Sequence, residues 1–289
     1  IPDKCTNPGG NILFVPGEYA TIQDAINVAV HGDEIIIGPG TYTGVGDWVV
    51  NPMGKELWIH SSDGPDVTII NGEGVRDGFQ CSSGENSETI IEGLTITNCS
   101  KGMYTEASTL TLTDCIFAAN NISGMYNYFS SPTLTNCTFT NNSVDSSGGG
   151  MYNWSASPTL TNCTFNGNSA FKNRGGAMCN TGLSISSPVL ENCTFTNNTA
   201  SYGGGMYNNY GASPTMTECT FTNNIAVYYG GGMSNNVDGY TGISTTTLTG
   251  CTFEGNTASL GGGMYNDNGR SPTLTDSRFC GNTPTHIEG

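Results

Sequence analysis

The stretch that decides the fold is Ser131-Pro-Thr-Leu-Thr-Asn-Cys-Thr-Phe-Thr-Asn-Asn142, followed by Gly148-Gly-Gly-Met-Tyr-Asn153. Closely similar text returns along the chain, and its phenylalanine marks each copy: Phe117, Phe139, Phe165, Phe195, Phe221, Phe253 and Phe279. The spacings between these phenylalanines are 22, 26, 30, 26, 32 and 26 residues. Self-similarity at a period of about 20–50 residues indicates a stacked array of structural repeats.

Within one repeat, apolar and polar residues alternate. Leu134 is predicted to point inward and Thr135 outward, which is the period of two of a β-strand. The alternation slips by one residue before Cys137, and Asn136 lies at the slip. Asparagine tolerates the left-handed conformation that such a corner requires. The repeat therefore predicts two strands that meet at an asparagine corner, and Gly-Gly-Met-Tyr-Asn predicts a third strand with Met151 inward and its tyrosine outward.

Three short strands in one repeat make one turn, or rung, of a parallel β-helix, and we predict an all-β solenoid of roughly ten rungs. Identical positions on successive rungs then stack about 4.8 Å apart. The inward cysteine ladder is predicted to comprise Cys99, Cys115, Cys137, Cys163, Cys193, Cys219 and Cys251. We expect these thiols to be free and buried, since a free cysteine packs as a small hydrophobe. The corner ladder, expected to be enclosed, runs through Asn98, Asp114, Asn136, Asn162, Asn192, Glu218, Gly250 and Asp276.

Four cysteines lie off this ladder. Cys179 takes the outward tyrosine position and Cys280 follows a ladder phenylalanine, so both are predicted to face outward. Cys5 with Cys81 is the one intramolecular disulfide that the sequence leaves open.

The chain is predicted to form one domain over 1–289. Residues 1–33 are expected to be an N-terminal cap with a helix at about 21–30, which Thr21 begins as N-cap and which buries Ile22, Ala25, Ile26 and Ala29. Residues 34–98 read as degenerate first rungs, 99–282 as regular repeats and 283–289 as a tail.

The N-terminal text resembles a known family. Tyr19-Ala-Thr-Ile-Gln-Asp-Ala-Ile-Asn27 and Gly32-Asp-Glu-Ile-Ile-Ile-Gly-Pro-Gly-Thr-Tyr42 resemble the entry of the pectin-lyase-like superfamily. The later repeats are similar to those of secreted bacterial β-helix-repeat proteins and of chlamydial polymorphic outer-membrane proteins. The resemblance implies a right-handed parallel β-helix whose helix caps the open end of the solenoid. It selects no single activity, because such folds host lyases, hydrolases, esterases, adhesins and spacers.

Charge and composition exclude several classes of partner. The chain has 24 acidic and 8 basic residues and a formal charge of −16, so no basic stripe for nucleic acid is present. Acidic polysaccharide is disfavoured for the same reason. The chain contains no run of 18 apolar residues, so the sequence predicts no membrane-spanning helix. The wealth of Asn, Thr, Ser and Gly suits an extracellular or cell-surface protein.

Catalytic and metal-binding patterns are sparse. Acids concentrate at 63–92, where a pair of carboxylates would permit acid/base chemistry, but a solvated edge is the more ordinary reading of such a run. We predict no catalytic residues, no metal site and no cofactor. The histidines lack metal-ligand spacing, and the only echo of a calcium loop is Asn266-Asp-Asn-Gly269.

Two surface patterns remain. The outward tyrosines and their neighbours are candidates for stacking on sugars or on a partner, with a self-stacked ladder as the alternative: Tyr126, Tyr152, Trp154, Tyr207 and Tyr265. Among the Asn-x-Ser/Thr sequons, the candidates for glycosylation are Asn121, Asn141, Asn153 and Asn197.

The sequence leaves three functions open. The first is a non-catalytic exported structural or surface β-helix, which we expect to self-associate end to end because no capping segment follows the last repeat. The second is a carbohydrate-binding or adhesin module that uses the tyrosine stripe. The third is a polysaccharide lyase or hydrolase with its site near 63–92.

Overall fold

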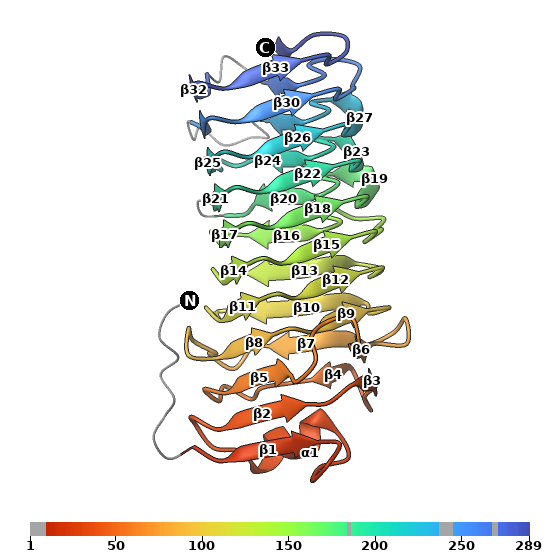
Figure 1. Ribbon diagram of the computed structural model, residues 1–289. Coiled ribbons are helices and arrows are strands. Elements are labelled where there is room, and N and C mark those ends of the chain that lie inside the picture. The colour runs from red at the N-terminus through yellow and green to blue at the C-terminus, as the bar shows by residue number, and fades with distance from the viewer. Residues whose placement is uncertain (1–9, 184–185, 237–244, 268–270) are drawn as a thin grey trace.

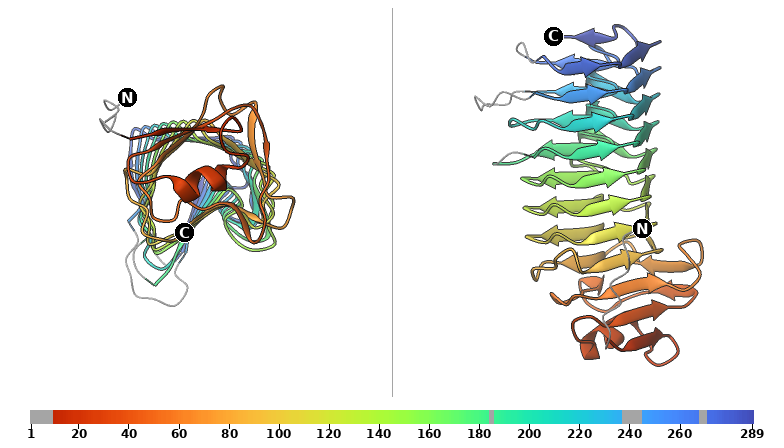
Figure 2. Two further views of the ribbon diagram at one scale, coloured as in Figure 1. Left: turned by 90° about the horizontal axis from the view of Figure 1, so that it is seen from below. Right: turned by 60° about the vertical axis from the view of Figure 1, so that its left-hand side comes forward.

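The computed structural model of the protein describes residues 10–183, 186–236, 245–267 and 271–289. The chain winds into a parallel β-helix of about ten rungs with three strands in each rung, as predicted. Figure 1 shows the rungs stacked from the N-terminal helix to the C-terminus, and the view along the axis in Figure 2 (left) shows their outlines superposed. The strands of each rung therefore build three long sheets that enclose one core.

The three sheets are named A, B and C, and their strands run in sequence order along the axis. Sheet A contains β1 (Ile12–Val15), β2 (Glu34–Ile37), β5 (Trp58–Ser61), β8 (Ile90–Glu92), β11 (Thr111–Thr113), β14 (Thr133–Thr135), β17 (Thr159–Thr161), β21 (Val189–Glu191), β25 (Thr215–Thr217), β29 (Thr247–Thr249) and β32 (Thr273–Thr275). Sheet B contains β3 (Gly40–Tyr42), β6 (Thr68–Asn71), β9 (Thr95–Thr97), β12 (Ile116–Ala118), β15 (Thr138–Thr140), β18 (Thr164–Asn166), β22 (Thr194–Thr196), β26 (Thr220–Thr222), β30 (Thr252–Glu254) and β33 (Arg278–Cys280). Sheet C contains β4 (Trp48–Val50), β7 (Asp77–Cys81), β10 (Lys101–Glu106), β13 (Ser123–Tyr128), β16 (Met151–Trp154), β20 (Met178–Thr181), β24 (Met206–Asn208), β28 (Met233–Asn235), β31 (Met264–Asn266) and β34 (Ile287–Glu288).

The N-terminal helix is shorter than predicted but has the predicted cap and buried face. Helix α1 spans Ile22–Val28, and the Thr21 hydroxyl accepts a hydrogen bond from the Asp24 amide. Its buried side chains lie over the first rungs, where they cover the end of the core. The sheets extend further at both ends than the predicted bounds. Strand β1 lies within the predicted cap but already belongs to sheet A, and β34 extends sheet C into the predicted tail.

Identical residues stack in register along the core. The ladder phenylalanines are fully buried from Phe117 to Phe253, and Phe279 is partly buried on the last rung. The Phe195 and Phe221 rings lie 4.5 Å apart with an interplanar angle of 2°. Leucine, cysteine and methionine ladders fill the rest of the interior. The core is thus one column of repeated contacts.

The asparagine corner forms as predicted but is not enclosed. Asn136 has a φ of 55° and Asn162 also has a φ of 55°, so both occupy the left-handed region. The Asn162 amide donates to Asn136 Oδ1 at 3.2 Å, which is the predicted bond along the axis. These side chains are nevertheless exposed, because the corner turns outward between sheets A and B. The expectation of a buried corner was wrong.

A second asparagine ladder is buried, and its role was missed. It consists of the residue three positions after each ladder phenylalanine: Asn120, Asn142, Asn168, Asn198, Asn224, Asn256 and Asn282. The Asn168 amide donates to the Phe139 carbonyl oxygen at 2.9 Å and to Asn198 Oδ1 at 3.0 Å. Its own Oδ1 accepts from the backbone and side-chain nitrogens of Asn142. Each amide therefore satisfies polar groups on the neighbouring rungs that would otherwise be buried without partners.

A third amide ladder runs along sheet C, also buried. Asn127, Asn153, Asn180, Asn208, Asn235 and Asn266 each follow the tyrosine position of their strand. The Asn127, Asn153, Asn180, Asn208 and Asn235 amides each donate to the Oδ1 of the next member at 2.8 Å. Thr105 starts the chain of bonds by donating to Asn127 Oδ1 at 2.7 Å.

A fourth, shorter sheet was not predicted. Sheet D contains β19 (Ser169–Arg174), β23 (Thr199–Tyr202) and β27 (Ile225–Tyr229), which form a lobe beside the solenoid (Figure 1). The lobe has a small apolar core of its own, formed by Val144, Ala170 and Ala200. Its strands occupy the longer connections between the buried asparagine and the glycine pair.

The glycine pairs return the chain from this lobe to sheet C. Gly203 has a φ of 62°, a conformation that side-chain-bearing residues rarely adopt. A Cβ at Gly204 would lie 2.5 Å from the Ile225 carbonyl oxygen of the next rung. The pair thus serves the sharp turn and the close stacking of backbones, which explains why it recurs in every rung that carries the lobe.

The cysteine ladder is buried and reduced. All ten cysteines within the described residues are free, and the seven predicted ladder members are at most 1% exposed. Cys179 was predicted to face outward, but it is buried because the lobe covers this part of sheet C. Cys280 is half-buried on β33. The open question of a bond between Cys5 and Cys81 lies outside the described residues, since these begin at residue 10.

Removing one buried amide should destabilise the solenoid strongly. We expect Asn168→Ala to lower the free energy of unfolding by about 1–3 kcal/mol for each buried group that it leaves without a partner. Asn166→Ala is the matched control, because this exposed amide lies on the same rung. Urea denaturation followed by circular dichroism measures both. Equal destabilisation by the two variants would contradict the assigned role of the buried ladder.

The Cys99 and Cys137 thiols of the ladder should resist alkylation in the native protein. Burial raises the pKa of Cys137 well above its usual value and the pKa of Cys99 to about 12. A raised pKa keeps the thiol protonated and unreactive at pH 8, whereas a thiolate would react. Peptide mapping after iodoacetamide treatment at pH 8 should show label on the half-buried Cys280 and none on Cys137 until urea is added. Labelling of native Cys137 at the rate of Cys280 would show that the core opens readily.

Candidate functional site

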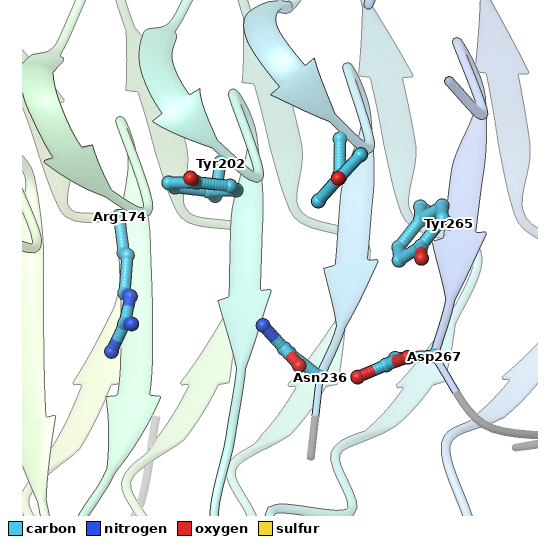
Figure 3. Close-up of a pocket in the computed structure, with 6 residues that line it drawn as sticks. Arg174, Tyr202, Asn236, Tyr265 and Asp267 are labelled. Carbon is cyan, nitrogen blue, oxygen red and sulfur yellow. The ribbon is translucent and has the colours of Figure 1, made fainter. Parts of the chain in front are cut away.

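A groove lies where the lobe meets the outer face of sheet C. It has a volume of about 330 Å³ and is lined by Arg174, Tyr202, Tyr229, Asn236, Tyr265 and Asp267. Figure 2 (left) shows the lobe projecting from the outline of the solenoid, and Figure 3 shows the labelled side chains projecting into one space from successive rungs. The groove therefore runs along the solenoid axis.

One wall comes from the last residues of the lobe strands. Arg174 pairs with Tyr202, and Tyr202 pairs with Tyr229, in the parallel register of sheet D. The Tyr202 and Tyr229 rings lie 5.6 Å apart. Each of these residues directly precedes a glycine with positive φ, so the turn back to sheet C fixes where the side chain points. The wall is thus a ladder of one cation and two aromatic rings.

The floor comes from sheet C. Tyr265 on β31 stacks on Tyr229 with a centroid distance of 4.5 Å and an interplanar angle of 15°, which joins floor and wall. Asn236 donates to the Tyr207 hydroxyl at 2.9 Å. The Arg174 guanidinium lies 5.2 Å from the centroid of the Tyr207 ring. Tyr207 therefore lies beneath the Arg174 guanidinium, and its contacts position Arg174 and Asn236 in the groove.

The electrostatics of the groove are mixed. Arg174 supplies a positive charge at one end and Asp267 a carboxylate three rungs further along. Desolvation raises the pKa of Tyr265, and the nearby Asp267 carboxylate raises it further, so its hydroxyl stays protonated and available as a donor at neutral pH. Aromatic faces beside a few polar groups are suited to binding a ring with hydroxyl substituents.

The predicted tyrosine stripe exists only in part. Tyr126 and Tyr152 stack at 4.8 Å, and Trp154 lies 6.4 Å from Tyr152, so these three form one half-buried aromatic cluster on sheet C. Tyr265 lies in the groove. The prediction that Tyr207 contacts a sugar was wrong, because its side chain is 0% exposed. Tyr207 instead supports the groove from beneath.

Sequence reasoning missed most of the groove, namely Arg174, Tyr202, Tyr229, Asn236 and Asp267. A signal for the wall was present, because Arg174, Tyr202 and Tyr229 each stand directly before the glycine pair of their repeat. This regularity indicates a shared position on successive rungs, but the sequence does not show that the chain before it folds back as a lobe.

The acids at 63–92 have separate structural roles. Glu85 is buried and accepts hydrogen bonds from the Gly54 amide and the Ser108 hydroxyl. Asp77 pairs with Lys101 at 3.0 Å. Among the described residues, no group of three or more His, Cys, Asp or Glu side chains is placed to hold a metal ion. The echo of a calcium loop at 266–269 falls partly outside the described residues.

The glycosylation candidates divide into two groups. Asn121, Asn141 and Asn197 are exposed at the edge of sheet B. Asn153 is 0% exposed and its amide belongs to the buried ladder of sheet C, so its prediction as an acceptor is corrected.

No helix in the described part of the chain has the length and apolar character to cross a membrane.

The comparisons define the class of protein. The model of the right-handed β-helix region matches residues 49–165 and 130–241, more than half of the chain, so the protein belongs to the right-handed β-helix family. No curated protein matches the sequence.

Among solved structures, pectate lyase Pel9A is 15% identical with a TM-score of 0.58, covering 93% of this chain and 78% of that one. The alginate lyase from Paenibacillus sp. str. FPU-7 is 14% identical with a TM-score of 0.52, covering 96% and 99%. ORF18 of Geobacillus virus E2 is 15% identical with a TM-score of 0.50, covering 89% and 56%. At these identities the likeness shows the fold alone.

Proposed function

We propose that the protein is a non-catalytic extracellular β-helix that binds carbohydrate in the groove between the lobe and sheet C. The observation that carries this proposal is the convergence of three tyrosine rings with Arg174, Asn236 and Asp267 around one cavity of about 330 Å³. Aromatic rings supply flat contact area for a sugar, and a few polar groups supply orientation. A formal charge of −16 favours an uncharged glycan over a polyanion.

The non-catalytic part of the proposal rests on the chemistry of the lining. Glycoside hydrolysis ordinarily uses two carboxyl groups on either side of the scissile bond. Asp267 is the one carboxylate among the six residues that line the groove. Similarity to a pectate lyase and an alginate lyase motivates a direct assay on both polysaccharides, in which we expect no unsaturated product.

The extended stack of rungs supports a structural contribution as well. A rigid solenoid holds the groove at a fixed place on a rod, which suits a surface protein that presents a binding site. End-to-end self-association remains a prediction, and sedimentation velocity over a range of protein concentrations tests it independently of glycan binding.

Carbohydrate binding should depend on the rings of the groove. On a panel of neutral oligosaccharides, we expect Tyr229→Ala and Tyr265→Ala each to raise the Kd about tenfold, since an aromatic contact contributes on the order of 1 kcal/mol. Tyr104→Ala is the matched control, because Tyr104 stacks on Tyr126 of sheet C and does not line the groove. Isothermal titration calorimetry measures the constants. No binding across the panel, or equal losses in all three variants, would reject the groove as a glycan site.

A further inference from the structure

The outer face of sheet A carries a regular array of threonine. From β11 to β32, six of the seven strands have the pattern Thr-x-Thr; the middle residue is buried on five of these, and Leu274 of β32 is 39% exposed on the last rung. The twelve outward positions are all at least partly exposed: Thr111, Thr113, Thr133, Thr135, Thr159, Thr161, Thr215, Thr217, Thr247, Thr249, Thr273 and Thr275. The exception is β21, which presents Val189 and Glu191.

The register turns these threonines into a two-dimensional lattice. Thr133 pairs with Thr159 and Thr135 with Thr161, and the same register continues through β32. Successive rungs lie about 4.8 Å apart, and the two threonines of one strand lie about 6.7 Å apart. Figure 2 (right), in which sheet A is turned forward, shows these strands evenly stacked. The hydroxyl groups are therefore repeated in two directions on one face.

The hydroxyls of this array are available to solvent. Thr111 donates to the Ser87 carbonyl oxygen at 3.1 Å. The other eleven hydroxyls form no hydrogen bond with any residue that the structure describes. Sheet B also carries Thr-x-Thr on β9, β15, β22 and β26, and there the Thr194 hydroxyl bonds to that of Thr164. The sheet A face thus combines ordered polar groups with unused hydrogen-bonding capacity.

The chemistry of the face limits what can bind to it. Its outward positions from β11 to β32 contain one charge, at Glu191, although the chain as a whole has a formal charge of −16. A charged mineral surface calls for an array of carboxylates, and a crystalline polysaccharide calls for a platform of aromatic rings. These fourteen positions contain neither. A periodic, uncharged hydroxyl and methyl array is complementary to a lattice of water.

We propose that the threonine face of sheet A binds ice. The two repeats of the array are close to the oxygen repeats on a prism face of the ice lattice, so water molecules held between hydroxyls can share positions with the crystal. Threonine is restricted about χ1, and the strands that carry it are held by the parallel register of sheet A and by the buried leucines on its inner face. Most of the conformational entropy of these side chains is therefore lost during folding, and little more is lost on binding. This activity is independent of the groove, which lies on sheet C.

The test uses the full chain and two substitutions at the centre of the array. The wild-type protein should show thermal hysteresis, shape ice crystals into facets and partition into a growing ice front. Thr161→Lys and Thr217→Lys place a long charged chain on the flat face, and each should abolish most of the hysteresis. Thr196→Lys is the matched control, because Thr196 is a partly exposed outward residue of β22 in sheet B. Circular dichroism confirms that each variant is folded.

Three results would overturn the proposal. The first is a wild-type protein that shows neither hysteresis nor partition into ice. The second is unchanged hysteresis in a folded Thr161→Lys or Thr217→Lys variant. The third is an equal loss in folded Thr196→Lys, which would separate the effect from sheet A. A parallel pull-down on microcrystalline cellulose completes the design: binding to cellulose that both sheet A variants lose, without ice activity in the wild type, would reassign the face to a crystalline polysaccharide.

Discussion

The structure depends on one constraint: the buried asparagine amides must find their partners on the adjacent rungs. Asn168 illustrates it, because its amide bonds the Phe139 carbonyl on one side and the Asn198 side chain on the other. An amide both donates and accepts, so a column of asparagines satisfies itself without water. The interaction works only if each rung presents the same side chain at the same height. The repetition in the sequence is therefore a consequence of hydrogen bonding inside the column as much as of apolar packing.

This constraint separates the parts of a rung that can vary from those that cannot. The short strands of sheets A and B are tied to their neighbours through the phenylalanine and asparagine ladders, and their lengths hardly change. The connection after the buried asparagine is free of that restriction. It is absent in the rung from Asn120 to Ser123 and becomes β19, β23 and β27 further along. The lobe, and with it the groove, arises where the column permits insertion. The groove is accordingly built in the connections, beside a core that cannot change to accommodate it.

The sequence predicted the ladders well, because alternation and repeat spacing are local properties. Leu134 and Met151 lie on the inward face that the period of two assigns to them, and Asn136 forms the corner at the slip in that period. It predicted poorly wherever one part of the chain covers another. Tyr207 and Cys179 occupy outward positions of sheet C, but both are buried beneath the lobe, and nothing in their local pattern shows this. The exposed corner at Asn136 and the buried Asn142 show the same limit, since both are asparagines next to a ladder residue. Only the direction of the turn decides which one water reaches.

The type of residue at the outward positions of each sheet depends on whether another segment covers that sheet. On sheet C, tyrosines and a tryptophan stack on each other or pack beneath the lobe, where large side chains bury apolar area. On sheet A no described segment folds across the regular rungs, and the outward positions of six strands are threonine, with Val189 and Glu191 of β21 as the exception. High strand propensity accounts for threonine at any one of these positions, but valine and isoleucine have it too. Sheet B repeats threonine as well, but its outward positions also include Asn166, Glu254 and Arg278, so the hydroxyl array is more continuous on sheet A. The proposed contact with ice gives one common explanation for this array and for the single charge that the face carries in so acidic a protein.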